Sequence, residues 1–211
     1  RIIFFAVLAT LGTLSGYAQS STESPYSQYG LGILADQSQG FSRGMNGVGL
    51  ALRKGNMVNT LNPASYSAVD SLTMVFDVGL SGQITNFKEN NVKLNARTAN
   101  FEYAVGSFRL FKNVGASFGV LPYSNVGYNY SSNVNLANDF GSFTNAYSGS
   151  GGLHQAFIGA GWRVMEPLSV GVNAAYFGGT YNRAALSSSS NSNVNSIRKT
   201  YYANINSYLI A

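Results

Sequence analysis

The stretch FSRGMNGVGLALRKGNMVNTLNPASYSAVD, from Phe41 to Asp70, differs from everything that follows it in the sequence. It is rich in glycine, shows no alternation of apolar and polar residues, and contains the tripeptide Asn62-Pro63-Ala64. The chain after it reads as extended segments in which apolar and polar residues alternate, which is the period of a β-strand with one apolar face. The contrast predicts a plug folded inside a wall that the later strands form. The alternative is a surface loop that merely leads into the first strand.

The first residues have the layout of a secretory signal peptide. Arg1 precedes an almost wholly apolar run over residues 2–14, and the small residues Gly16 and Ala18 come shortly after it. The run is shorter than the ~20 residues that a membrane-spanning helix needs. We therefore expect residues 1–18 to be removed after Ala18 on export. An uncleaved anchor helix is the alternative.

The charge of the chain argues against a nucleic-acid partner. Its 211 residues include 13 Lys and Arg against 8 Asp and Glu, a formal net charge of +5, but these charges are spread singly. A nucleic-acid-binding domain gathers its basic residues on one face. Only 10% of the residues are charged, against about 25% in a typical soluble domain. That composition suits a wall with one face in lipid and the other in water.

Six segments alternate with the period of a strand, and we assign their apolar sides to an outer, lipid-facing surface. In the second segment this side contains Phe101, Tyr103 and Val105. A soluble β-sandwich alternates in the same way, but these segments are longer than the ~5–6 residues of its usual strands. The segments are residues 72–86, 98–111, 114–121, 153–164, 168–181 and 199–211.

The connections between the segments are alternately long and short. The long ones are polar and cover residues 87–96, 131–152 and 184–197; the short ones are Lys112-Asn113 and residues 165–167. Long loops at one end and short turns at the other are typical of outer-membrane β-barrels. We predict an all-β fold: a transmembrane antiparallel β-barrel with an N-terminal luminal hatch, in the outer membrane of a Gram-negative bacterium.

Six strands are too few to close such a barrel, since the smallest bacterial examples have about eight. The sequence therefore reads as the N-terminal part of a longer protein, in three parts. These are a signal peptide at residues 1–18, an N-terminal segment with the hatch at residues 19–70, and the first six barrel strands at residues 71–211.

Short motifs in the N-terminal segment resemble the hatch of the FadL/TodX/OmpP1 family of outer-membrane transporters. They are Ser42-Arg43-Gly44-Met45 with the glycines after it, and Leu61-Asn62-Pro63-Ala64-Ser65 just before the first strand. Residues 24–32, SPYSQYGLG, are similar to the opening of Bacteroidetes members of that group.

The resemblance implies a barrel of about fourteen strands. It also implies uptake of hydrophobic small molecules, such as long-chain fatty acids or aromatic compounds, which leave sideways into the bilayer. The residues that it places in the hatch are Arg43, Gly44, Gly47, Gly49, Asn62, Pro63 and Ala64.

In that family a kinked strand beside the hatch opens the wall, and the resemblance places this lateral gate at Leu121, Pro122 and Tyr123. Proline cannot donate a hydrogen bond to a neighbouring strand, and inside a strand it marks a bulge or a break. Pro122 is therefore a candidate hinge. The alternative is that the strand ends here and a loop begins.

The sequence contains no pattern typical of a catalytic or metal site. His154 is the only histidine and the chain has no cysteine, so a zinc site lacks its usual ligands. No serine, histidine and aspartate have the spacing of a nucleophile elbow. We expect no enzyme activity and no cofactor.

Two functions remain, and they differ in what the barrel contacts. The first is uptake of hydrophobic compounds, with membrane lipids and a small-molecule ligand as partners. The alternative is a non-transporting subunit or scaffold of a larger outer-membrane complex, with other outer-membrane proteins as partners. An apolar pocket beside the hatch favours the first, and a filled interior favours the second.

Overall fold

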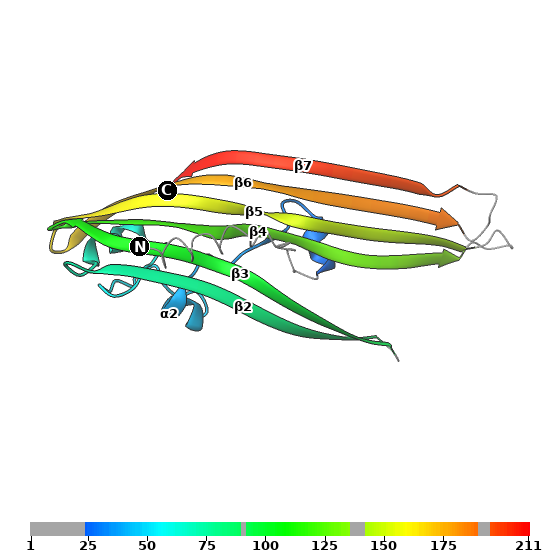
Figure 1. The fold of residues 1–211 in the computed structure, drawn as a ribbon, viewed down its shortest axis with the longest axis horizontal. Helices are drawn as coiled ribbons and strands as arrows, with labels where there is room; N and C mark the ends of the chain where they lie inside the picture. Colours follow the sequence, from blue (N-terminus) through cyan, green and yellow to red (C-terminus); the bar gives the residue numbers. More distant parts are fainter. Residues whose placement is uncertain (1–23, 90–91, 136–141, 190–194) are drawn as a thin grey trace, which may run out of the picture.

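The computed structural model describes residues 24–89, 92–135, 142–189 and 195–211. Six long strands form one antiparallel sheet in which each strand lies beside its neighbours in the sequence (Figure 1). This confirms the predicted all-β, antiparallel character. The predicted signal peptide lies outside the described residues. The strands are β2 (Met74–Glu89), β3 (Val92–Phe111), β4 (Val114–Asn135), β5 (Ser142–Met165), β6 (Leu168–Ser189) and β7 (Ile197–Ile210).

The two predicted short turns are confirmed. β3 and β4 are joined at Lys112-Asn113, and β5 and β6 are joined at Glu166-Pro167. Both turns lie at the same end of the sheet, on the left in Figure 1, which we call the short-turn end.

The three predicted long loops are wrong for much of their length, because the strands continue into them. Residues 131–135 pair with residues 142–146, for example, and residues 184–189 pair with residues 143–148. These stretches are rich in serine and asparagine, which give no periodic signal. Their side chains instead bond across the strands: Ser187 Oγ lies 2.7 Å from Asn145 Oδ1. Such cross-strand pairs stabilise a sheet.

The two faces of the sheet differ as predicted on β5. Ile158 is 66% exposed on the apolar outer face, whereas its neighbour Phe157 is 7% exposed on the opposite face. We call the second face the covered face, because the N-terminal segment packs on it.

On β3 the predicted outer set is wrong for Tyr103 and Val105, which are buried on the covered face. Phe101 pairs with Leu80 of β2, whereas Tyr103 pairs with the adjacent Gly79, so one extra residue lies on β3 between the two pairs. A bulge of this kind changes the face to which the following side chains point. Apolar and polar residues therefore keep alternating along β3, but after the bulge the apolar side chains point to the covered face and no longer to the outer face.

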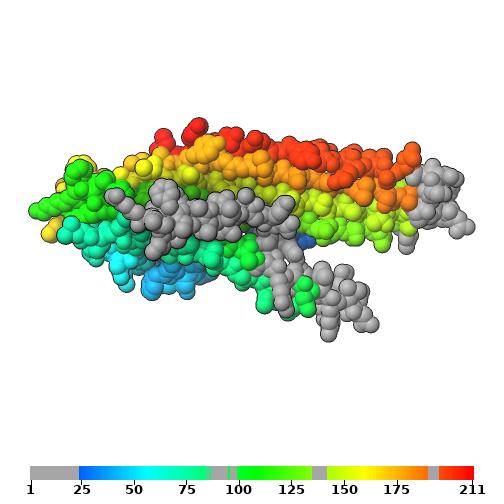
Figure 2. Space-filling view, viewed as in Figure 1, coloured from blue at the N-terminus to red at the C-terminus, as the bar shows by residue number. Residues whose placement is uncertain are grey.

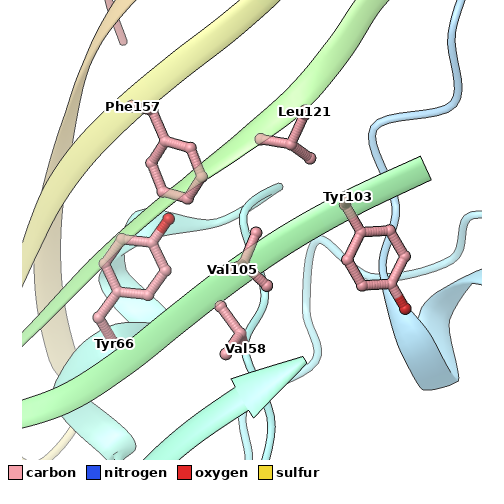
Figure 3. Packing of buried hydrophobic residues seen from close by; sticks show 6 residues of the cluster. All are labelled: Val58, Tyr66, Tyr103, Val105, Leu121 and Phe157. Carbon is pink, nitrogen blue, oxygen red and sulfur yellow. The ribbon is translucent and has the colours of Figure 1, made fainter. Parts of the chain in front are cut away.

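The N-terminal segment, residues 24–73, lies against the covered face. Its elements are η1 (Pro25–Gln28), β1 (Ile33–Leu34), α2 (Gly40–Gly44) and η2 (Pro63–Ala68). The light-blue and cyan atoms of this segment lie toward the short-turn end, the dark-blue first residues lie farther along the sheet, and the strands extend beyond both (Figure 2). Among the described residues, no helix has the length and apolar character needed to cross a membrane. The buried cluster between segment and sheet is Val58, Tyr66, Tyr103, Val105, Leu121 and Phe157 (Figure 3).

Adjacent residues of β4 provide a test of this core. Leu121 is 1% exposed and Val120 is 41% exposed. Leu121→Ala removes a packed side chain and is expected to lower the unfolding free energy by about 2–5 kcal/mol, whereas Val120→Ala costs much less. Urea unfolding in detergent, followed by the fluorescence of the single tryptophan, Trp162, measures both. Equal losses would contradict the assignment of the faces.

Candidate functional site

The candidate site is the contact between the N-terminal segment and the covered face, and it begins at η2. Asn62 is the N-cap of η2: its Oδ1 accepts a hydrogen bond from the Ala64 amide at 3.1 Å, and its Nδ2 donates to the Leu50 carbonyl at 2.7 Å. Pro63 follows at the start of η2, where its missing amide hydrogen costs nothing. The three residues predicted from the tripeptide therefore form the start of a short 3-10 helix.

Three glycines on adjacent strands allow η2 to lie directly on the sheet. Gly115 of β4 faces the Tyr66 carbonyl, and Gly161 of β5 and Gly171 of β6 both face the Pro63 backbone. A Cβ atom at any of the three would overlap these backbone atoms. Only glycine permits so close an approach. We call these three residues the glycine platform.

Tyr66 holds η2 in place with its side chain. It is 1% exposed, and its ring lies in the cluster with Phe157 and Leu121 (Figure 3). Burial raises the pKa of Tyr66 to about 12, because a phenolate would lose its hydration there. The docked state of η2 therefore favours the neutral phenol.

A second group of contacts joins α2 to β3. Nη2 of the predicted hatch residue Arg43 donates to Glu102 Oε2 at 2.7 Å, and its Nε lies 3.8 Å from Asp36 Oδ2. Beside this pair, the Gly40 amide donates to the Tyr103 hydroxyl at 2.7 Å. Charge-assisted contacts of this kind are stronger than neutral ones. They attach α2 to β3, which is not one of the three strands that carry the glycine platform.

The three predicted hatch glycines have different surroundings. Gly47 has a φ of +82°, a conformation that favours glycine. Gly49 is packed against Ser42 and Leu61, so a side chain would crowd them. Gly44 has no neighbouring atom within 4 Å of the place where a Cβ would lie. Only the first two are therefore required by their local structure.

The N-terminal segment also crosses a seam in the sheet. The pairing of β3 with β4 ends at Ala104 and Val120, and beyond this point the two strands diverge (Figure 1). There the edge of β4 pairs with β1, through Ser124 and Asn125. Because Arg43 is attached to β3, the segment is bound to both sides of what we call the β3–β4 seam.

The residues predicted as a lateral gate lie at this seam. Leu121 is buried, the Pro122 carbonyl accepts a hydrogen bond from Gln37 Nε2 at 2.8 Å, and the Tyr123 ring packs against Phe177 with centroids 4.6 Å apart. β4 continues through Pro122 to Asn135, so the interpretation that the strand ends there is wrong. The register shifts between Pro122 and Ser124, as expected for a proline inside a strand.

A cavity of about 310 Å³ lies between the N-terminal segment and β2. Polar and charged side chains share its lining with apolar ones, among them Gln39, Phe41, Lys54 and Asp77. The contact between η2 and the sheet, by comparison, is filled by the buried cluster (Figure 3). The sequence leaves two alternatives, an apolar pocket beside the hatch and a filled interior. Among the described residues, the contact between segment and sheet resembles the filled interior more.

The glycine platform was not predicted, although the sequence contains a signal for it. Gly115, Gly161 and Gly171 all fall on the side of their strands opposite the apolar residues. A glycine inside a strand often marks a place where another backbone approaches closely. Glycines on one face of adjacent strands therefore indicate a docking surface.

These features define a class of protein: an antiparallel β-sheet with its own N-terminal segment docked on one face. The chain matches the family model BamG over residues 1–209 and belongs to the BamG family. That family is associated with the outer membrane. The search of curated proteins gives no match, and the search of solved structures gives none either.

The family match overturns the resemblance to FadL/TodX/OmpP1 transporters, and with it the expected FadL-like uptake of lipids and other hydrophobic compounds. The residues behind the resemblance serve local structure. Asn62 caps η2, Pro63 begins it, and Gly47 adopts a positive φ. Any chain that makes such turns selects the same residue types, so these short motifs do not distinguish one family from another.

The glycine platform can be tested with alanine. Gly161→Ala places a methyl group against the Pro63 carbonyl and is expected to detach η2, so that trypsin cleaves at Arg53 and Lys54 about tenfold faster through local opening. Gly44→Ala is the matched control, because its surroundings are open. Similar cleavage rates for the two variants would show that η2 does not need the platform.

The buried phenol predicts a dependence on pH. The pKa of Tyr66 rises from 10.0 to about 12 on folding, so the stabilisation that Tyr66 provides is complete below pH 10 and is lost as the pH rises through 12. The loss amounts to about 2–3 kcal/mol. Tyr66→Phe keeps the ring and cannot ionise, so it is expected to lose less stability over this range. Urea unfolding at increasing pH measures both proteins; parallel losses would contradict the prediction.

Proposed function

We propose that this chain is a non-catalytic subunit of the machinery that assembles β-barrel proteins in the outer membrane. The observation that carries the proposal is the family match over residues 1–209, because the name BamG points to a component of β-barrel assembly. The proposal corresponds to the predicted subunit or scaffold of a larger complex, and its partners are other outer-membrane proteins.

The filled covered face supports this proposal. Tyr66, Leu121 and Phe157 occupy the space between η2 and the sheet, and the glycine platform excludes even a methyl group from the contact. A rigid, occupied interior suits a protein that presents surfaces to partners.

In our proposal the sheet is part of the wall of a transmembrane barrel, with its exposed apolar rows against lipid acyl chains. Toward the short-turn end these rows include Phe118, Ile158, Trp162 and Val172. A tilted strand crosses the ~30 Å hydrocarbon layer with about 9–11 residues, whereas β5 has 24. The serine- and asparagine-rich ends of the strands then project beyond the membrane, and the short turns face the periplasm.

The N-terminal segment then has two roles in the proposed barrel. After export by the signal peptide at residues 1–18, residues 19–70 form the luminal hatch, and residues 71–211 contribute to the wall. At the β3–β4 seam, Leu121, Pro122 and Tyr123 form the side that the segment covers. An open strand edge has no hydrogen-bond partners in lipid, so β1 is needed to pair with β4 where β3 leaves it.

Purification from membranes tests the proposed function. The full-length protein, tagged and extracted from outer membranes in mild detergent, is expected to carry other outer-membrane subunits with it in fixed ratio. Depletion of the protein is expected to lower the amount of folded barrel proteins in the outer membrane. An unrelated outer-membrane barrel with the same tag is the control. A protein that purifies alone, and whose loss leaves barrel assembly unchanged, would contradict the proposal.

A further inference from the structure

Two arginines lie together at the short-turn end of the covered face, outside the contacts described above. Arg163 is on β5, two residues after Gly161 on the same face, and its amide donates to the Asn113 carbonyl in the β3–β4 turn at 2.8 Å. Arg53 belongs to the N-terminal segment, and its Nη2 donates to Ser67 Oγ of η2 at 3.1 Å. The docking of η2 therefore brings Arg53 to Arg163.

The polar atoms around Arg163 are not fully bonded. Within the described residues, Arg163 Nε is buried without a hydrogen-bond partner, and so is Ser169 Oγ. Ser169 is the residue of β6 that pairs directly with Arg163. Buried donors without partners are costly and rare. The Nε of Arg163 on β5 and the hydroxyl of Ser169 on β6 therefore leave hydrogen-bonding capacity unused at the same level of the sheet.

Within the described residues, no carboxylate forms an ion pair with Arg53 or Arg163. Burial, and then the charge of Arg163, lower the pKa of Arg53, which shows that the two guanidinium groups repel one another. The ion pairs recorded among the described residues both belong to Arg43, so neither arginine has a carboxylate within 4.0 Å there. Glu166, in the adjacent turn, is exposed. An anion between the two arginines would remove the repulsion.

We propose that Arg53 and Arg163 bind a carboxylate of an acidic segment that belongs to a partner subunit, an inference that rests on the proposed function and extends it. Guanidinium groups match the planar carboxylate and bind it with two parallel hydrogen bonds. The position favours a protein partner over a lipid headgroup, because the arginines lie on the covered face and the apolar rows that suit lipid lie on the other. The partner reaches the site from the side of the short turns.

Binding of a labelled tetraglutamate peptide to the purified full-length protein in detergent tests the site directly. Fluorescence anisotropy is expected to show at least about tenfold weaker binding for Arg163→Gln and for Arg53→Gln, and a smaller loss for Arg53→Lys. Arg198→Gln is the matched control, because Arg198 lies at the start of β7, at the other end of the strands. Unchanged resistance of the N-terminal segment to chymotrypsin, which cleaves after aromatic residues and so keeps its sites in all these variants, shows that the variants are folded.

Two further measurements separate the sources of the anion and the two proposals. Vesicles of phosphatidylglycerol are expected to bind wild type and Arg163→Gln equally; vesicle binding that depends on Arg163, without peptide binding, overturns the protein partner. In membranes, Arg163→Gln is expected to recover fewer partner subunits than wild type. Equal recovery of partner subunits by the two proteins overturns this inference and leaves the proposed function intact. A wild-type protein that recovers no partner subunits contradicts the proposed function itself.

Discussion

The close approach of η2 to the sheet is the constraint on which the rest of the N-terminal segment depends. Its peptide groups rest on glycines of three adjacent strands, at places where a side chain would fill their space. The three glycines face η2 together only when β4, β5 and β6 are in this register. A slip of one residue in β5 would bring the side chain of Ala160 or Trp162 to the covered face. The N-terminal segment can therefore dock in this position only when the sheet has this register.

From that anchor the contacts change in kind along the segment. At η2 backbone packs on backbone, and around Tyr66 the contact is apolar. At α2 it becomes ionic, through Arg43 and Glu102, and at β1 it is a short ladder of strand pairing. The ion pair fixes the segment to β3. The pairing with β1 provides hydrogen-bond partners for the backbone of β4 after β3 diverges from it. The segment thereby holds together two parts of the sheet that no longer pair directly.

The sequence predicted the elements whose signal is local. Alternation identified the two faces of β5, and the short turns followed from the abrupt change between strands. It could not show that strands continue through serine- and asparagine-rich stretches, because their stabilisation comes from partners such as Asn145 and Ser187, which are distant in the sequence. It also placed Tyr103 on the wrong face, since one extra residue in β3 is invisible until the partner strand is known. The glycine platform is hidden for the same reason: its meaning depends on three strands lying side by side.

Acidic side chains of the described residues gather around α2, where two of them offset the charge of Arg43. Asp36 and Glu102 neutralise Arg43, and Asp77 accepts a hydrogen bond from Tyr103, so several of these acids lie around α2. With 8 acidic residues against 13 basic ones, the chain cannot neutralise all its positive charges. Complementary charge contributes most to specificity and to the rate of association where a surface is not already neutralised. An incoming acidic group therefore contributes more beside Arg53 and Arg163, which have no ion pair among the described residues, than beside Arg43, whose charge Glu102 already offsets.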